Sequence, residues 1–360
     1  MSSYSHEVDR TDLGTTRIVD IPPASEVTLE AGTALLRVDS FALTANNITY
    51  GVAGDMIGYW QFFPAEGNWG RIPVWGKGTV IAAGETGLSE GSEYYGYFPM
   101  SSYLQVRPEN VTARGFVDGA EHRASLPPAY NHYSLMTADN GFDRRYDSHR
   151  MVYYPLFITG FVLDDYLFDN DFFGADKVIL SSASSKTSIS LAFMLKQRGA
   201  HSIGLTSAGN RAFVESLRLY NEVFTYDEIE SLDAGSRAAY VDMAGNRGLL
   251  GKVHHHFGDN LVCSCGVGIT HWESRDGAAP ESLPGAQPAM FFAPSQIQKR
   301  NQDWGPEKFQ ATMNAAWDAF LGQVDHWITI HEGSGRDMLN EYYETVLRGA
   351  PPNAGYVVRL

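Results

Sequence analysis

The sequence has 360 residues, of which 44% are apolar and 19% are charged, and its formal net charge at pH 7 is −15. This length allows two domains with a sizeable core, and the acidic balance disfavours nucleic acid or an anionic membrane as a partner. No apolar run is long enough to span a bilayer, and the first residues lack the apolar segment of a secretion signal, so we expect a cytoplasmic protein. The two cysteines, Cys263 and Cys265, are expected to be small core residues in a reducing compartment.

Short apolar segments between glycine and proline residues predict a β domain in the first third of the chain. Residues 16–22, 32–43, 74–85 and 94–111 are rich in β-branched and apolar residues. We therefore expect a small barrel-like domain with many turns over about residues 16–120, followed by a connector of turn-forming residues.

Predicted strands and helices alternate after residue 151. A helix with Asp164 and Asp165 on its solvated side is expected over 155–174, and later helices are expected over 306–324 and 334–349. Between them, strands are predicted over 177–182, 202–207, 222–226, 238–245 and 260–268, with helices over 185–199, 210–220 and 249–258. This alternation indicates a parallel sheet with right-handed crossover connections.

The turn between the first strand and helix of this region is the most informative segment. Its sequence over 181–187, SSASSKT, stands where a dinucleotide-binding βαβ unit has its phosphate turn, although the usual glycines are absent. Hydroxyl and backbone N–H groups at a helix N-terminus favour phosphate, and the lysine adds positive charge. The alternative is a helix whose serines cap its own amides. The predicted cofactor contacts here are Ser182, Ser184, Ser185, Lys186 and Thr187.

The end of the second strand bears on the choice of cofactor. NAD sites usually carry Asp or Glu there for the ribose 2′-hydroxyl. Here Thr206 and Ser207 are neutral donors and Arg211 is a nearby cation. This pattern favours the 2′-phosphate of NADPH over NADH, unless Arg211 is an ordinary surface residue of a first helical turn.

Several segments carry a resemblance to a known superfamily. Residues 40–56, SFALTANNITYGVAGDM, resemble the segment after an early strand in quinone oxidoreductases and enoyl reductases, with Asn47 where those proteins usually have Asp. Residues 343–360 resemble their closing helix and strand. With this order of domains, the chain resembles the medium-chain dehydrogenase/reductase superfamily. The segments ALTANNITY, DWG and VGITHW are similar to sequences of a poorly characterised branch of this superfamily, known only as a domain of unknown function.

The resemblance implies an α/β fold with two domains. An N-terminal GroES-like β-barrel domain would span residues 1–150 and hold the substrate. A Rossmann-type doubly wound parallel sheet would span 151–324, and residues 325–360 would return to the catalytic domain. It also implies a homodimer.

The zinc ligands of the alcohol dehydrogenases in this superfamily are missing. Neither cysteine lies in the first domain, and the Gly-His-Glu motif and the four-cysteine lobe are absent, whereas a zinc site needs three or four protein ligands. His254–His256 is the one remaining cluster. Adjacent helical side chains diverge by about 100°, so we expect a solvated helix face there and no metal.

Candidates for the chemistry lie in three segments, of which one is Thr159–Gly160 beside Asp164 and Asp165 in the helix expected over 155–174. Asn47, Tyr50 and Tyr59 are polar groups among apolar neighbours, and a tyrosine hydroxyl can protonate or stabilise an enolate. The alternative for each tyrosine is ordinary buried packing.

The second segment begins at the carboxyl end of a predicted parallel strand, where open α/β sheets bind ligands. Gly266 and Gly268 would let the backbone approach the nicotinamide. His271 would act as an acid or a substrate clamp, unless it is a loop histidine without a role.

Together these features predict a zinc-independent, NADPH-linked reductase of an activated double bond or carbonyl, such as an enone, quinone or enoyl thioester. An apolar or planar small molecule would be its substrate. Two alternatives remain open: a degenerate nucleotide-binding sensor or scaffold without turnover, and a lyase or isomerase that uses the same fold without net redox chemistry.

Overall fold

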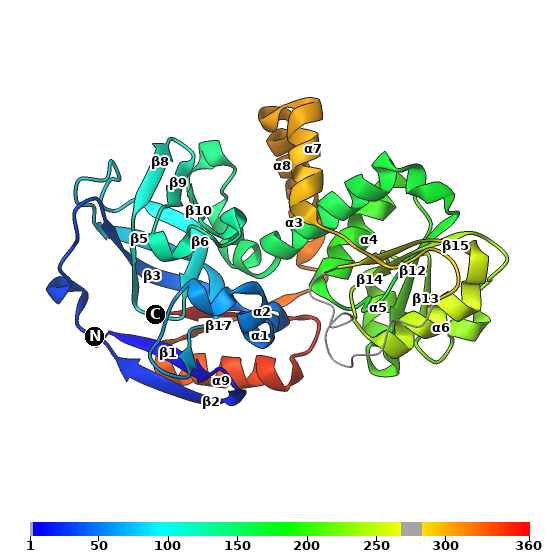
Figure 1. Ribbon diagram of the computed structural model, residues 1–360, viewed down its shortest axis with the longest axis horizontal. Coiled ribbons are helices and arrows are strands. Elements are labelled where there is room, and N and C mark those ends of the chain that lie inside the picture. The colour runs from blue at the N-terminus through cyan, green and yellow to red at the C-terminus, as the bar shows by residue number, and fades with distance from the viewer. Residues whose placement is uncertain (1–2, 268–282) are drawn as a thin grey trace. The chain divides into compact units, whose positions relative to one another are not determined.

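The computed structural model describes residues 3–267 and 283–360. The chain divides into two compact units (Figure 1), one formed by Met1–Val152 with Ile328–Leu360 and the other by Tyr153–Trp327. The predicted site residues Gly268 and His271 lie outside the described residues. Among the described residues, no helix combines the length and apolar character needed to cross a bilayer.

The first unit is built on a mixed β-sheet. Its strands follow the order β17 (Thr329–Ser334), β18 (Ala354–Arg359), β3 (Ala34–Leu43), β5 (Pro73–Ala82), β6 (Glu93–Pro99), β10 (His132–Leu135), β9 (Gly115–Asp118) and β8 (Pro108–Thr112), with β7 (Tyr103–Val106) also paired to β3. A smaller sheet contains β2 (Asp12–Asp20), β1 (Tyr4–Asp9) and β4 (Trp69–Gly70). The late strand β18 pairs antiparallel with the early strand β3, so distant parts of the sequence share one sheet.

Helices of the first unit connect these strands. Helices α1 (Ala45–Val52) and α2 (Gly54–Ile57) follow β3, and α9 (Gly335–Gly349) joins β17 to the parallel strand β18 and packs against both. The predicted β domain is therefore present, and its last helix and strand come from the end of the chain.

The second unit contains a parallel sheet of the doubly wound type. Its strands follow the order β13 (Glu222–Thr225), β12 (Ser202–Thr206), β11 (Lys177–Leu180), β14 (Ala238–Asp242), β15 (Leu261–Gly266) and β16 (Ala289–Met290), and each pair is parallel. Counted along the chain, this order is 3-2-1-4-5-6, as in Rossmann folds. The order reverses between β11 and β14, so the carboxyl ends of these two strands flank the place where such sheets bind ligands. The predicted fold class is confirmed.

Helices cover both faces of this sheet because the crossovers run in opposite directions from β11 (Figure 1). Helix α6 (Arg247–Phe257) packs through Leu249, Val253 and Phe257 on sheet residues that include Ile179 and Tyr240. Helices α4 (Lys186–Arg198) and α5 (Arg211–Leu217) connect the strands on the other side of the switch. Phe193 of α4 contacts Phe320 of α8 (Pro306–Val324), which begins at the predicted proline.

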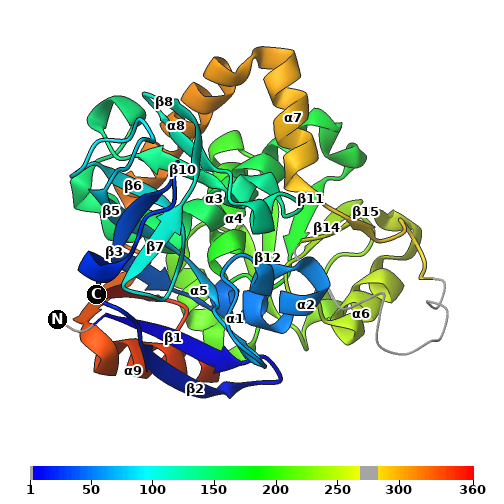
Figure 2. The same ribbon diagram turned by 60° about the vertical axis from the view of Figure 1, so that its left-hand side comes forward.

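Two features of the helices differ from the sequence predictions. Helix α7 (Ala293–Trp304) was not predicted, and it forms an antiparallel hairpin with α8 (Figure 2). Asp164 and Asp165 of α3 (Asp147–Asp169) are buried rather than solvated. Arg198 donates to the Asp164 carboxylate at 3.0 Å, and Arg300 of α7 donates to that of Asp165 at 2.7 Å. The predicted solvated side of this helix is therefore wrong, because distant arginines neutralise both carboxylates.

Candidate functional site

The turn after β11 replaces the usual glycines by a different arrangement. Ser182 has a left-handed backbone with φ of 50°, a conformation that glycine normally supplies. Ala183 is fully buried, its N–H donates to the Leu205 carbonyl at 2.9 Å, and its own carbonyl accepts from the Tyr220 hydroxyl at 2.8 Å. A Cβ atom at Gly204 of β12 would lie 3.0 Å from the Ala183 Cβ atom. Gly204 of the facing strand thus permits the close packing that a glycine of the turn permits in the usual motif.

The serines of this turn also serve the helix that follows. The Ser185 hydroxyl is the N-cap of α4 and accepts from the Ser188 N–H at 3.2 Å, while the Ser188 hydroxyl donates to the Ser181 carbonyl at 3.0 Å. The structure therefore realises the predicted capping of the helix. The first amides of α4 point toward the end of β11, where the helix dipole favours an anion.

Two more side chains border this helix end. Burial lowers the pKa of Lys186 to about 8, and its Nζ atom lies 5.9 Å from the centre of the Tyr153 ring. Thr187 lies beside it in the first turn of α4 and is partly buried. A lysine with this pKa still carries its positive charge at pH 7 in most of the molecules.

Asn210 is a site residue that the sequence analysis missed. Its amide nitrogen donates to the Ser184 hydroxyl at 3.1 Å, so it joins the turn after β12 to the turn after β11. The available signal was an asparagine in a Gly-Asn turn directly after a predicted strand, a position that favours side-chain hydrogen bonds to neighbouring turns.

The residues at the end of β12 and after it differ in their exposure and in the partners that they already have. Thr206 is buried, and Ser207 is exposed. Arg211 forms ion pairs with Glu215 and with Glu228, each at 2.8 Å. These carboxylates partly offset its positive charge. They therefore weaken the prediction that Arg211 binds the 2′-phosphate of NADPH.

The switch point itself is organised by a buried carboxylate. The Oδ1 atom of Asp242 accepts from the Ser181 hydroxyl at 2.8 Å, from the Tyr240 hydroxyl at 3.2 Å and from the N–H groups of Ala244 and Gly245 at 3.0 and 3.1 Å. Hydrogen bonds to an ionised acceptor are strong ones. This network fixes the loop after β14 against the end of β11.

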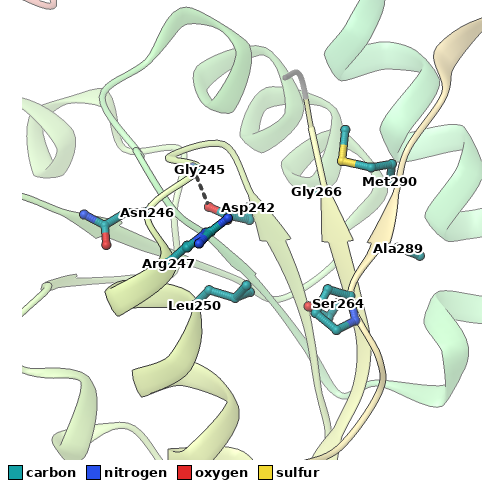
Figure 3. Close-up of a pocket in the computed structure, with 10 residues that line it drawn as sticks. Asp242, Gly245, Asn246, Arg247, Leu250, Ser264, Gly266, Ala289 and Met290 are labelled. Atoms are coloured by element: carbon teal, nitrogen blue, oxygen red, sulfur yellow. Dashed lines mark hydrogen bonds between the residues drawn. The ribbon is translucent and has the colours of Figure 1, made fainter. Parts of the chain in front are cut away.

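A shallow open hollow lies beside that loop (Figure 3). It is bounded by the ends of β14, β15 and β16 and by the start of α6. Asp242, Ser264 and Gly266 come from the strands, and Arg247 and Leu250 come from the helix. Of the two predicted backbone contacts to nicotinamide, Gly266 therefore lines this hollow.

Ser264, which lines the hollow, is hydrogen-bonded to a buried histidine behind it. The His254 Nε2 atom lies 2.9 Å from the Ser264 hydroxyl oxygen, and its Nδ1 atom lies 2.8 Å from the Pro284 carbonyl. Because a carbonyl only accepts, Nδ1 donates to Pro284 and Nε2 accepts the Ser264 hydrogen. His254 is fully buried, so the solvated helix face predicted for it is wrong, although His255 is exposed. In the described parts of the chain, no three histidine, cysteine or acidic side chains come together as a metal-binding group.

Asn47 is engaged by the fold of the first unit. Its Oδ1 atom accepts from the Thr44 N–H at 2.7 Å, and its Nδ2 atom donates to the Pro73 carbonyl at 2.9 Å. The side chain is buried and caps α1 together with Thr44. These contacts give Asn47 a structural role in the fold, and its catalytic role stays a prediction.

Tyr50 and Tyr59 are brought together in an aromatic cluster. Their ring centres are 4.6 Å apart, and Phe62, Trp75, Tyr97 and Tyr130 surround them. The Tyr59 and Tyr130 hydroxyl oxygens are 3.0 Å apart. Burial raises the pKa of Tyr59 to about 12, so its hydroxyl is protonated at neutral pH and can donate.

The described cofactor candidates all belong to the second unit, and Asn47, Tyr50 and Tyr59 all belong to the first. The two units together have the architecture of medium-chain dehydrogenases/reductases, a mixed β-rich domain and a Rossmann-type parallel sheet. The chain belongs to the family described as "Protein of unknown function (DUF2855)", which matches residues 41–351. The predicted uncharacterised branch is confirmed, and the solved structures similar to this chain confirm the predicted fold.

Solved structures with this fold include several reductases. The chain is similar to CurA from Vibrio vulnificus in complex with NADPH, with 12% identity, a TM-score of 0.59 and coverage of 99% of this chain and 98% of that chain. It is also similar to the quinone oxidoreductase from Coxiella burnetii, with 14% identity, a TM-score of 0.54 and full coverage of both chains (100% each). A mutant enoyl thioester reductase from Candida tropicalis matches at 12% identity and a TM-score of 0.57, again with 100% of each chain covered. Identities this low establish the fold alone, and no curated protein matches the sequence.

Proposed function

We propose that this protein is a zinc-independent reductase that uses NADPH to reduce an activated double bond or carbonyl in an enone, quinone or enoyl thioester. The observation that carries the proposal is the polar turn of residues 181–187, which lies at the switch point of a sheet with the order 3-2-1-4-5-6. Ligands of doubly wound sheets bind at this point. The similar structures include one in complex with NADPH, a quinone oxidoreductase and an enoyl thioester reductase.

The turn fits a pyrophosphate group although it lacks the usual glycines. The methyl group of Ala183 is fully buried and directed at Gly204 in the neighbouring strand. The extra carbon atom therefore packs against the sheet. The first amides of α4, together with the Ser184 and Ser185 hydroxyls and Lys186, would hold the phosphates there.

The residues after β12 favour NADPH over NADH. Ser-Ala-Gly follows this strand at 207–209, so no carboxylate stands where NAD sites bind the ribose hydroxyls. Ser207, Asn210 and Ser184 supply neutral hydrogen-bond donors on this edge. Arg211 would contribute to a 2′-phosphate only in competition with its two glutamate partners, so we expect a modest preference.

The proposed chemistry has two parts. Bound NADPH would supply a hydride to the substrate. Tyr59 would supply the proton, since its hydroxyl is protonated at neutral pH and belongs to an aromatic cluster that suits a planar substrate. Without a group of metal ligands in the described residues, hydroxyl donors would stabilise the negative charge that develops on the substrate. By resemblance we also propose a homodimer, which light scattering would test.

Titration with NADPH and NADH tests the cofactor assignment. Ser184→Asp places a negative charge in the turn and should weaken NADPH binding at least tenfold, because about 1.4 kcal/mol of phosphate repulsion suffices for that. Ser216→Asp is the matched control, since Ser216 is exposed on α5 away from the turn. If neither nucleotide changes the fluorescence or the melting temperature at millimolar concentration, the reductase proposal fails.

A nucleotide-binding sensor or scaffold without turnover is the second candidate. It is favoured by the use of Ser184 and Ser185 in hydrogen bonds of the fold itself. NADPH consumption with a panel of enones, quinones and enoyl thioesters separates the two candidates. Product that forms without NADPH consumption would indicate a lyase or isomerase.

A further inference from the structure

The strand side of the hollow beside the loop after β14 carries two polar side chains. The hollow lies within the second unit, and these side chains are Asp242 of β14 and Ser264 of β15 (Figure 3). An ionised carboxylate only accepts hydrogen bonds, whereas a serine hydroxyl can accept or donate. The direction of the Ser264 hydroxyl therefore decides which kind of ligand group this side of the hollow can bind.

The histidine behind Ser264 fixes that direction. The His254 Nδ1 atom lies 2.8 Å from the Pro284 carbonyl oxygen, and its Nε2 atom lies 2.9 Å from the Ser264 hydroxyl oxygen. A carbonyl only accepts, so Nδ1 carries the single ring hydrogen of neutral His254. Burial lowers the pKa of His254 below its ordinary value, so the ring is neutral at neutral pH. Nε2 therefore accepts the one hydrogen of the Ser264 hydroxyl.

Only lone pairs of the Ser264 oxygen remain for a ligand. With its hydrogen on the bond to His254, the hydroxyl can accept a further hydrogen bond but cannot donate one. Ser264 and the Asp242 carboxylate thus form an acceptor surface. A ligand group that binds there must bring an N–H or O–H donor, because a group with lone pairs alone would leave the Ser264 oxygen without a hydrogen bond.

The position of Ser264 relative to the phosphate turn narrows the choice of donor. The turn of residues 181–187 follows β11, β14 is the next strand of the sheet, and β15 lies one strand further. Neighbouring strands are about 4.8 Å apart, so β15 is roughly 10 Å from β11. In a nicotinamide dinucleotide the ribose follows the pyrophosphate, and the ring with its carboxamide comes last. The donor expected at β15 is therefore the carboxamide, which has two N–H bonds.

We propose that Ser264 and His254 form an amide-selective subsite, in which Ser264, with its hydrogen held by His254, accepts a hydrogen bond from the carboxamide N–H of the nicotinamide ring. This inference rests on the proposed NADPH-dependent function and adds the residues that choose among pyridine nucleotides. Ser264 contacts the cofactor, whereas His254 is a positioning residue that acts through Ser264.

The affinities of two nucleotides test the subsite by binding alone. NADP⁺ carries the carboxamide, and its acetylpyridine analogue has a methyl group in place of the amide nitrogen, so that its shape is kept and its N–H donor is lost. Calorimetry should show that the protein binds NADP⁺ about tenfold more tightly, because the analogue leaves the Ser264 oxygen unpaired. Ser264→Ala should reduce the ratio of the two dissociation constants to about one, since neither nucleotide then finds an acceptor there.

Ser202→Ala is the matched control. Ser202 is a buried serine of β12 in the same sheet, and its hydroxyl has no hydrogen-bond partner within the described part of the chain. Its removal should leave the ratio unchanged. His254→Phe frees the Ser264 hydrogen, which can then donate to the ketone oxygen of the analogue, so this variant should also lower the ratio.

An unchanged ratio in Ser264→Ala overturns the inference, because general damage to the fold weakens the binding of both nucleotides equally. Should Ser264→Ala fail to fold, Ser264→Cys replaces it. A thiol is only a weak acceptor, so the ratio should fall in the same direction, and a ratio equal to that of the unaltered protein again overturns the inference.

The ring hydrogen of His254 can be located without any nucleotide. Nitrogen NMR of protein labelled in its histidines distinguishes the two neutral forms of the ring at neutral pH, and the signals that disappear in His254→Phe identify this residue. We expect the hydrogen on Nδ1 and none on Nε2. A hydrogen on Nε2 overturns the inference, because Ser264 would then keep its own hydrogen for the ligand.

Failure of the subsite differs from failure of the proposed function. If neither NADP⁺ nor its analogue binds, the reductase proposal fails and the subsite fails with it. If the unaltered protein binds both nucleotides equally well, or if the hydrogen of His254 is on Nε2, the reductase proposal stands and the subsite alone is overturned.

Discussion

Replacement of Gly204 by alanine tests how the turn after β11 accommodates Ala183. The new Cβ atom would lie 3.0 Å from the Ala183 Cβ atom and 3.1 Å from the Tyr220 ring. Carbon atoms in contact are about 3.5–4.0 Å apart, so both neighbours must move. They are held by hydrogen bonds to the Leu205 carbonyl and between the Tyr220 hydroxyl and the Ala183 carbonyl. Overpacking of this kind costs ~1–3 kcal/mol of unfolding free energy, reduced by ~0.4–1 kcal/mol because alanine restricts the unfolded chain.

Replacement of Ala183 by glycine tests whether the contact between the two Cβ atoms causes the destabilisation. Ala183→Gly removes one buried methyl group and adds backbone freedom, which together cost about 1–2 kcal/mol. In the double variant the contact between the two Cβ atoms is gone and only the contact with the Tyr220 ring remains, since the methyl group is now on the strand and not in the turn. We expect its destabilisation to be smaller than the sum of the single changes by ~1–2 kcal/mol.

Urea unfolding of the four proteins, followed by circular dichroism, gives the coupling free energy, and NADPH titration shows whether the turn still binds. Gly204→Ala should weaken NADPH binding, and the double variant should recover it. If the changes in unfolding free energy of the two single variants add up within about 0.5 kcal/mol, Gly204 does not make room for the Ala183 methyl group, and the explanation of the turn is refuted.

Further predictions concern charge and capping. Burial lowers the pKa of His6 from 6.5 to about 4, so the neutral ring is favoured in the folded state. The protein should therefore lose about 3 kcal/mol of stability as pH falls from 6.5 to 4. Thermal melts of His6→Phe should lack this loss. Ser185→Ala should cost ~1 kcal/mol by removing the N-cap of α4, whereas Ser185→Asp should keep the melting temperature and weaken NADPH binding. Glu228→Gln frees one side of Arg211, so it should tighten NADPH binding and leave NADH binding unchanged, and equal effects on both would contradict a role for Arg211 at the 2′-phosphate.

The fold was predictable where its signal is local. Strand–helix alternation and the SSASSKT turn lie in consecutive residues, so β11, α4 and β12 were predicted close to their observed bounds. Helix α7 escaped prediction because its sequence, APSQIQKRNQDW, has few apolar residues, and its position depends on ion pairs of Arg300 with α3.

The site was less predictable because its contacts are long-range. Nothing near Tyr59 in the sequence indicates Tyr130, which is 71 residues away. Likewise, His254 appears solvated within its triple-histidine run, and only the fold brings Ser264 and the Pro284 carbonyl to its ring. A sequence pattern specifies an element and its apolar face, whereas the partner of a buried polar group is decided by topology.

The pairing of β18 with β3 has a consequence for synthesis. The sheet of the first unit lacks two strands, β17 and β18, until residues 354–359 have left the ribosome, because β17 joins the sheet only through β18, although β3 itself is made early. The second unit is continuous over 153–327 and can fold before the last residues of the first unit have been synthesised. During this interval β3 exposes an open edge, the feature through which nascent chains associate wrongly. Conditions that slow the ribosome after residue 327 should therefore increase aggregation more than the same delay before residue 153.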